Sequence, residues 1–135
     1  MRRLSLCLFF LLAFAIPVQA RAAKPISVTP QQLERRIKHD PSLLIADVRS
    51  RQSFQRRHLK GAASMPLVQI SQWAPKLKPN QWIALYCACP HDEMSLAAAK
   101  LLVSRYHHTR SLVLHQGIDG WIADGYPFEE SENYP

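Results

Sequence analysis

The sequence predicts an α/β protein with a mainly parallel, five-stranded sheet and helices on both faces. Short apolar segments alternate with helical segments along the chain, and one of them, SLLIADV, is apolar almost throughout. Such a run is typical of a strand that is covered on both faces of a sheet. Strands that alternate with helices favour parallel pairing. At 135 residues, with 47% hydrophobic and 20% charged residues, the chain has the composition of one globular domain.

Residues 1–20 are predicted to be a signal peptide that is not part of the fold. Two arginines precede a long apolar run, and the small residue Ala20 follows it. The run is shorter than the roughly 20 residues of a membrane-spanning helix, and Pro17 interrupts its end. We therefore expect no stable membrane anchor after cleavage. The mature chain should begin near Arg21 or Ala23 and be periplasmic or secreted.

The charge distribution argues against nucleic acid as a partner. Removal of residues 1–20 leaves a formal net charge of +5 in place of +7. The basic residues are scattered among the segments LERRIK, QRRHLK and PKLK instead of forming one stripe. The sequence indicates neither a protein partner nor an oligomeric state.

The folded domain is expected to span residues 28–130, and its first half contains three predicted strands. PISVTP predicts a short strand, and Thr29 and Pro30 then suit the N-cap and first position of a helix through QQLERRIKHD. SLLIADV predicts the second strand. SFQRRHLKG predicts a short helical turn that ends at Gly61, and AASMPL a third strand that Pro66 terminates.

The second half continues the alternation. Ile70, Trp73 and Leu77 recur at helical spacing, which predicts a short helix with a bend at Pro75. The remaining segments follow as a fourth strand QWIALYC, the longest helix EMSLAAAKLLVSRY, a fifth strand SLVLHQG, and a short helix with its cap in IDGWIADGYPF.

Cys87 and Cys89 lie where the fourth strand turns into the longest helix. In open α/β sheets, ligands bind outside the carboxyl ends of the strands. A helix start presents unpaired N–H groups and the positive end of the helix dipole, so a thiol beside it ionises more easily. A thiolate there can take a sulfur atom from a donor and pass it to an acceptor thiol. The alternative is that both cysteines are small hydrophobic residues of a buried strand.

Three motifs resemble the rhodanese family. IADVRSRQSFQRRHLKGAASMPL is similar to the rhodanese signature, in which the matching residues are Asp47, Arg49, His58, Gly61, Ala62 and Pro66. LYC stands where that family has its catalytic cysteine, and LHQGIDGWIADGYP is similar to the closing element of the family. The resemblance runs from about Val28 to Glu129. It implies a rhodanese-like sulfurtransferase or persulfide carrier that takes sulfur from a small donor and gives it to a thiol acceptor, without a cofactor.

The loop after the cysteines departs from the family pattern. A typical rhodanese loop contains a glycine and an arginine. The corresponding loop of this chain contains neither and carries Asp92 and Glu93. These acids favour a helix start but oppose a thiolate and an anionic donor, so weak activity with thiosulfate is expected. Gln116 also replaces the first glycine of the closing element. We expect the substrate loop to consist of Ala88, Pro90, His91, Asp92, Glu93, Met94 and Ser95, with Asp47, Arg49 and His58 as supporting residues.

The sequence leaves the nucleophile open between Cys87 and Cys89. Cys89 gives the loop length of the family, whereas Cys87 follows the strand directly. Pro90 favours Cys87, because a proline lacks the N–H that would complete a cradle around Cys89. A metal such as Cu(I) or Zn on the two cysteines and His91 would need further ligands, so no metal site is predicted. A non-catalytic binding module and a Cys-x-Cys redox or metal-handling protein remain alternatives.

Overall fold

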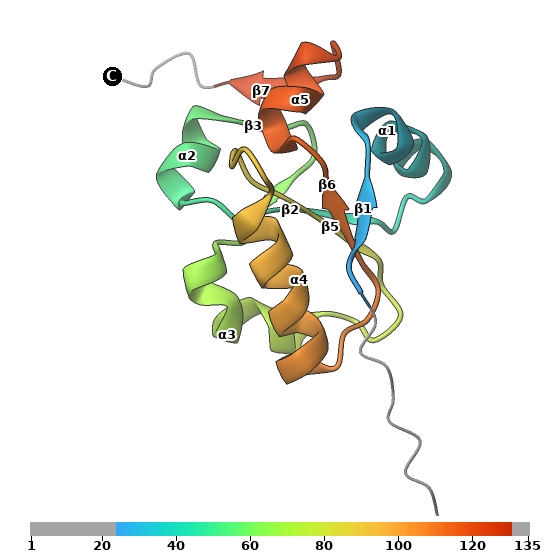
Figure 1. Ribbon diagram of the computed structural model, residues 1–135, viewed down its shortest axis with the longest axis vertical. Coiled ribbons are helices and arrows are strands. Elements are labelled where there is room, and N and C mark those ends of the chain that lie inside the picture. The colour runs from blue at the N-terminus through green and yellow to red at the C-terminus, as the bar shows by residue number, and fades with distance from the viewer. Residues whose placement is uncertain (1–23, 131–135) are drawn as a thin grey trace, which may run out of the picture.

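A five-stranded parallel sheet forms the centre of the protein in the computed structural model, which describes residues 24–130 (Figure 1). The strand order is β1-β6-β5-β2-β4, and every neighbouring pair is parallel. The strands are β1 (Ile26–Val28), β2 (Leu44–Asp47), β4 (Ala63–Ser64), β5 (Ile83–Tyr86) and β6 (Ser111–Leu114). This architecture confirms the predicted fold class. The predicted signal peptide, residues 1–20, lies outside the described residues.

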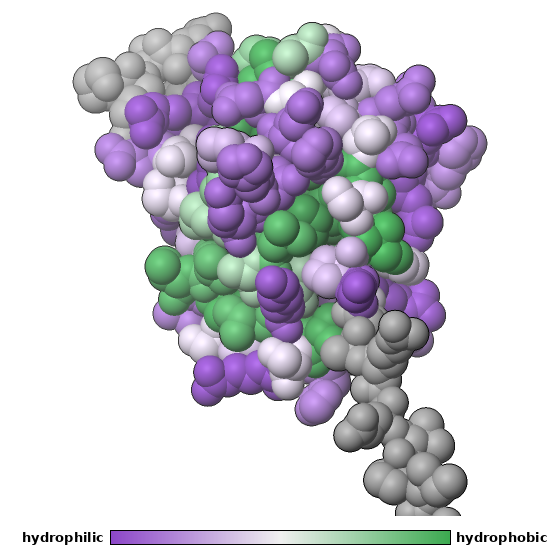
Figure 2. All heavy atoms as spheres, viewed as in Figure 1, coloured by the Kyte–Doolittle hydropathy of each residue, from purple (hydrophilic) through white to green (hydrophobic). Residues whose placement is uncertain are grey.

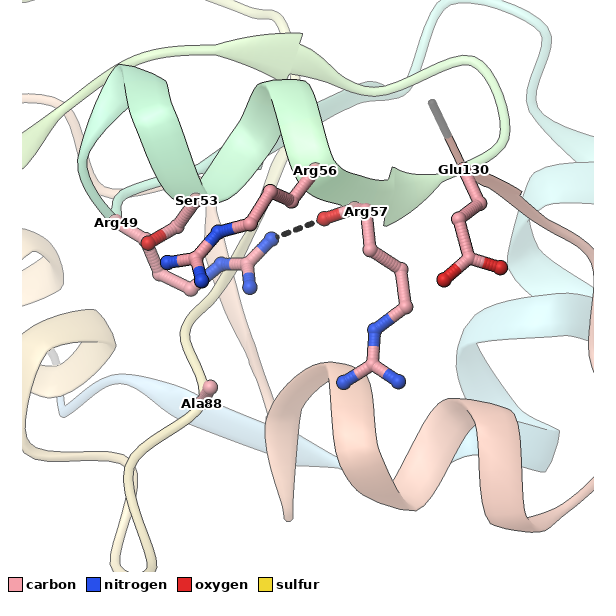
Figure 3. A pocket seen from close by; sticks show the side chains of 6 residues that line it. All are labelled: Arg49, Ser53, Arg56, Arg57, Ala88 and Glu130. Atoms are coloured by element: carbon pink, nitrogen blue, oxygen red, sulfur yellow. Dashed lines mark hydrogen bonds between the residues drawn. The ribbon is translucent and has the colours of Figure 1, made fainter. Parts of the chain in front are cut away.

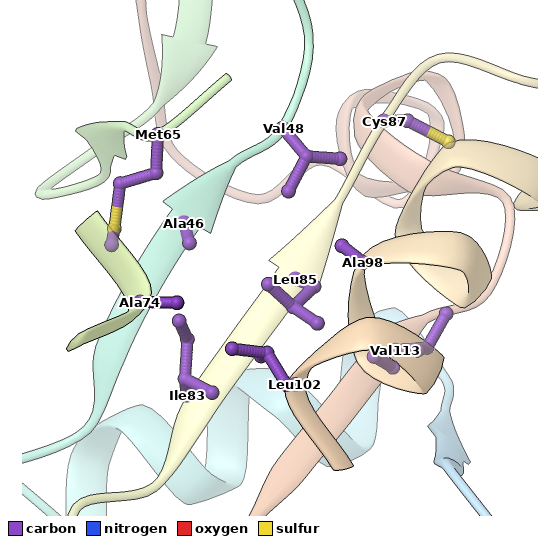
Figure 4. Close-up of a cluster of buried hydrophobic side chains, with 11 residues drawn as sticks. Ala46, Val48, Met65, Ala74, Ile83, Leu85, Cys87, Ala98, Leu102 and Val113 are labelled. Carbon is purple, nitrogen blue, oxygen red and sulfur yellow. The ribbon is translucent and has the colours of Figure 1, made fainter. Parts of the chain in front are cut away.

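Helices cover both faces of this sheet and enclose two apolar clusters. The helices are α1 (Pro30–His39), α2 (Arg51–Arg56), α3 (Ile70–Trp73), α4 (Glu93–Tyr106) and α5 (Gly117–Ala123). One cluster joins the sheet to α3 and α4 (Figure 4), and the other joins it to α1 and α5. All four residues of β5 are buried, which explains its continuous apolar sequence.

The start of α1 agrees with its sequence signals. The hydroxyl of Thr29 accepts the N–H of Gln32 at 3.2 Å, and the side chain of Gln32 accepts the N–H of Thr29 at 2.9 Å. This reciprocal capping box satisfies two donors that a helix start would otherwise leave unpaired, and Pro30 occupies the first turn. The predicted cap of this helix is therefore confirmed.

A second, antiparallel sheet was not expected from the sequence. It pairs β3 (Arg57–Leu59) with β7 (Phe128–Glu130), in segments where a helical turn and a helix cap were predicted. Only α2 forms within the predicted helical turn, and β3 follows it at once. The pairing partner lies about 70 residues away, so no local pattern indicated these strands.

The third predicted strand, 62–67, is also shorter than expected. Only Ala63 and Ser64 form β4, and two 3-10 turns, Leu67–Gln69 and Ala74–Lys76, flank α3. The backbone nevertheless stays beside β2 as far as Leu67, whose N–H donates to the carbonyl of Val48 at 3.0 Å.

Polar residues cover most of the face shown in Figure 2, and apolar residues gather on it over α3. Val68, just before α3, is 89% exposed. None of the helices within residues 24–130 has the length and apolar character needed to cross a membrane.

Candidate active site

Cys87 follows β5 directly and belongs to the buried core. Its side chain is fully buried and lies in the cluster between the sheet and α4 (Figure 4). The N–H of Cys89 donates to Cys87 Sγ at 3.4 Å, which is one contact of the kind that stabilises a thiolate. The chain thus holds the Cys87 sulfur at the carboxyl end of the sheet, in front of the start of α4.

Cys89 is a partly exposed thiol beside Cys87, and neither residue is in a disulfide. Burial and the neighbouring Cys87 thiol raise the pKa of Cys89 to about 11, although the N–H of Met94 acts in the opposite direction. A thiol with such a pKa is almost entirely protonated at neutral pH, and a protonated thiol is a poor nucleophile. The more accessible of the two sulfur atoms is therefore protonated at neutral pH.

Asp92 fixes the far end of the loop. It adopts a left-handed conformation with φ of 59° immediately before α4, and its N–H donates to the carbonyl of Cys89 at 3.3 Å. Its buried carboxylate meets the Nδ1 of His115, at the end of β6, at 2.9 Å. The other carboxylate oxygen, Oδ1, and the hydroxyl of Ser95 are buried without a hydrogen-bond partner.

Glu93 behaves differently from Asp92, although both were predicted to oppose a thiolate. Its side chain is 58% exposed and contacts the backbone N–H and the ring of His91, at 3.3 Å and 3.4 Å. Its charge is the smallest of the causes that raise the pKa of Cys89. Glu93 therefore acts on the loop as an exposed charge, whereas Asp92 is buried against His115.

Asp47 and Arg49, two of the predicted supporting residues, form an ion pair at the end of β2, the strand beside β5. Arg49 Nε donates to Oδ1 of Asp47 at 2.9 Å, and its Nη2 donates to Oδ2 at 2.6 Å. The same Nη2 reaches the carbonyl of Arg57 at 2.6 Å. Burial is the largest single effect on the pKa of Arg49 and lowers it, but the hydrogen bonds and charge of Asp47, together with Tyr86, outweigh burial and raise the pKa. The pair is a fixed structural support.

His58 supports the second sheet and not the cysteine loop. Its Nδ1 lies 2.8 Å from the carbonyl of Phe54, on α2, and its ring stacks on that of Phe54. Its Nε2 lies 3.0 Å from a carboxylate oxygen of Glu129, on β7. The contacts of His58 thus join α2 to β7.

The start of α5 packs directly on the backbone of Cys87. The N–H of Ile118 donates to the Cys87 carbonyl at 2.9 Å. Gly117 has φ of +51°, and a Cβ at this position would lie 2.0 Å from the same carbonyl oxygen. Gln116 adopts the left-handed conformation that a glycine would adopt more easily. The closing motif therefore holds the backbone of the cysteine, a contact that its sequence spacing alone did not reveal.

Two pockets meet at Ala88, between the cysteines. One, of about 370 Å³, is lined by Ala88, Cys89, Pro90, Gln116, Asp119, Gly120 and Ala123. The other, of about 420 Å³, is lined by Arg49, Ser53, Arg56, Arg57, Ala88 and Glu130 (Figure 3). The sequence showed Arg56 and Arg57 only as scattered charges. Both arginines follow the predicted strand that ends at Asp47 within about ten residues. This short separation was the signal that they could lie at the carboxyl edge of the sheet, near the cysteines.

No metal site is evident in the part of the chain that the structure describes. Within residues 24–130, no three side chains of His, Cys, Asp or Glu are grouped so as to hold a metal ion. The site that the fold defines is thus a thiol pair at a strand-to-helix turn of a parallel α/β protein.

Comparison with known families agrees with this class of fold and site. The family described as Rhodanese-like domain matches residues 29–124, so the chain belongs to the rhodanese-like family. No curated protein matches the chain significantly.

Solved structures of rhodanese-like proteins share the fold. The solution structure of a rhodanese-like domain from Anabaena is 26% identical with a TM-score of 0.69, and the match covers 81% of this chain and 89% of that one. A crystal structure of the same Anabaena protein is 28% identical with a TM-score of 0.67, covering 78% and 81%. A rhodanese-related protein from Thermoplasma volcanium, at 23% identity, covers 77% and 97% with a TM-score of 0.66, which shows the fold alone.

Proposed function

We propose that the protein is a sulfurtransferase or persulfide carrier that holds a sulfane sulfur on Cys87. The observation that carries this proposal is the pair of free thiols at the carboxyl end of β5, where the N–H of Cys89 donates to Cys87 Sγ. In this reaction the Cys87 thiolate attacks the outer sulfur of the donor, and the donor's sulfur–sulfur bond breaks. With thiosulfate, sulfite leaves with the electron pair, and Cys87 becomes a persulfide.

The two thiols have different parts in this proposal. The N–H of Cys89 donates to Cys87 Sγ, which favours Cys87 as the nucleophile, and the raised pKa of Cys89 disfavours Cys89 in that part. Cys87 is buried, and a donor therefore reaches it only when some of the residues that cover it move aside. Cys89 lines an open pocket and is placed to compete for the bound sulfur as the persulfide is emptied.

The burial of Cys87 also favours a second candidate, a non-catalytic rhodanese-like binding module. The loop contains neither the arginine nor the glycine that a typical rhodanese places around the sulfur, and weak thiosulfate activity remains our expectation. Export to the periplasm or the medium likewise remains a prediction from residues 1–20.

Mass measurement with matched cysteine variants tests this function. Wild-type protein exposed to thiosulfate, or to a persulfide donor, should gain the mass of one sulfur atom on the peptide that contains residue 87. Cys87→Ser should abolish this gain, and Cys89→Ser should keep it but slow or redirect release of the sulfur.

Two outcomes contradict the proposal in different ways. Loss of loading in Cys89→Ser alone would move the nucleophile to Cys89. If no donor loads wild-type protein that thiol titration shows to be reduced, the binding module replaces the carrier.

A further inference from the structure

A small cavity lies where α4 ends, at the opposite edge of the sheet from the cysteine loop. Because α4 starts at that loop and has 14 residues, its two ends are about 21 Å apart. Ile83, at the start of β5, donates its N–H to the carbonyl of Arg110, just before β6, so this region lies at the amino edge of the sheet. The cavity has a volume of about 300 Å³, and its lining includes Ala74, Pro75, Leu77, Pro79, Tyr106 and His108. We call it the His108 cavity.

The end of α4 places the side chain of His108 inside the protein. His107 adopts a left-handed conformation with φ of 54°, and the N–H of His108 donates to the carbonyl of Leu102 at 2.9 Å. This hydrogen bond is typical of a Schellman cap, in which the residue at the position of His108 frequently makes an apolar contact with the helix. His108 is only 5% exposed. The sequence therefore has a polar ring where such a cap favours an apolar side chain.

The Nε2 atom of His108 is buried without a hydrogen-bond partner. Burial is the largest effect on the pKa of His108 and lowers it, although hydrogen bonds with the backbone of Gln81 and Arg110 act in the opposite direction. The ring is therefore neutral at neutral pH, and its Nε2 either donates or accepts one hydrogen bond. Because an unpaired buried polar atom costs free energy, a ligand that pairs with Nε2 gains affinity.

The remaining walls of the cavity are apolar or aromatic. Leu77 and the ring of Tyr106 pack against the apolar cluster between the sheet and α4. Pro75 and Pro79 add two proline rings. None of these four side chains is a carboxylate, a lysine or an arginine, so none compensates an ionic ligand for the water that it would lose. The cavity therefore suits an uncharged ligand with one hydrogen-bonding group.

We propose that the His108 cavity binds a small uncharged phenol, whose ring contacts the apolar walls and whose hydroxyl pairs with Nε2 of His108. A hydroxyl both donates and accepts, so it suits either tautomer of the imidazole. The volume of about 300 Å³ is at the lower end of the range that is usual for small-molecule sites, and it admits a single ring. This site involves neither cysteine and is independent of the proposed sulfur transfer.

NMR titration of wild-type protein with p-cresol and with toluene tests the cavity. The two ligands share a ring and a methyl group, and only p-cresol carries a hydroxyl. p-Cresol should shift the amide signals of Leu77, Tyr106 and His108, and it should bind about fivefold more tightly than toluene, since its hydroxyl pairs with a buried atom. The amide signals of Cys87 and Cys89 should not move.

Matched histidine variants identify the atom that recognises the hydroxyl. His108→Phe keeps an aromatic ring and removes Nε2, so it should abolish the preference for p-cresol over toluene. The ratio of the two affinities is the measurement, because a change in cavity size affects both ligands. His39→Phe makes the same change at the exposed end of α1 and should leave the preference at about fivefold. If His108→Phe does not fold, the two ligands still decide the question on wild-type protein.

Three results would overturn this inference. Absence of p-cresol binding at the His108 cavity, including signal shifts confined to the cysteine loop, would mean that water alone meets Nε2. Equal binding of toluene and p-cresol to wild-type protein would show an apolar cavity that does not recognise a hydroxyl. An unchanged preference for p-cresol in His108→Phe would show that another group binds the hydroxyl.

Discussion

The ends of two neighbouring strands, β2 and β5, are built in opposite ways. They lie side by side, with Asp47 in register with Tyr86. At the end of β2, both oxygens of Asp47 accept hydrogen bonds from Arg49. After β5, one oxygen of Asp92 at the end of the loop and the hydroxyl of Ser95 in the first turn of α4 are buried without hydrogen-bond partners. A fully paired strand end is a rigid support, whereas an incompletely paired one is able to change its contacts.

Matched aspartate variants give the largest expected difference between these regions. Asp47→Asn should lower the free energy of unfolding by about 3–5 kcal/mol, because it leaves the mostly buried Arg49 without its counter-charge. Asp92→Asn should lower it by no more than about 1 kcal/mol, since one of its oxygens has no partner to lose and His115 is half exposed. Urea denaturation measures both. Equal losses would show that the two strand ends are equally rigid.

Glycine variants test how firmly the β5 end is held by α5. Gly117→Ala should cost about 2–3 kcal/mol, because the added Cβ would overlap the Cys87 carbonyl in a left-handed backbone. Gly125→Ala, with φ of +77° and open space around it, should cost only about 1 kcal/mol. Thermal unfolding of both proteins checks this order. Similar costs would mean that the contact with Cys87 adjusts easily.

The smallest expected effect concerns the exposed acid of the loop. Glu93→Gln should lower the pKa of Cys89 and speed its alkylation by the anion iodoacetate about two- to threefold. Neutral iodoacetamide should respond less, because it is not repelled by Glu93. Glu34→Gln, on α1, serves as the control. An equal response to both reagents would assign the effect to the thiol pKa alone, and no response would remove Glu93 from the electrostatics of the loop.

Local sequence patterns were sufficient for most of the fold. The capping residues Thr29 and Gln32, and the unbroken apolar sequence of β5, reflect interactions within a few residues or burial on both faces. The β3–β7 sheet depends instead on pairing between distant and mostly polar segments. A strand whose residues alternate weakly and are largely exposed leaves no local signal.

The candidate site likewise contains residues that local motifs located and contacts between distant segments that they did not reveal. Motif spacing located Cys87, Cys89 and the Asp47–Arg49 pair, because these residues lie at strand ends. It did not show the contact of Asp92 with His115, which joins the start of α4 to the end of β6. Nor did it show that His58 faces Glu129. Such contacts follow from the order of strands in the sheet, which the sequence alone does not specify.

The strand order also constrains the sequence of events during folding. β1 has only β6 as its partner in the sheet, and Ile26 pairs with Leu112, which is made 86 residues later. The β3–β7 sheet likewise forms only after Glu130 has been synthesised, and Glu130 also lines the pocket that contains Arg49 and Ala88. The first strand of the domain therefore remains unpaired until β6 has been synthesised, and non-local pairing of this kind slows folding. A chain interrupted before β6 would expose the edges of β1 and β5 together, which makes incomplete products targets for proteolysis or aggregation.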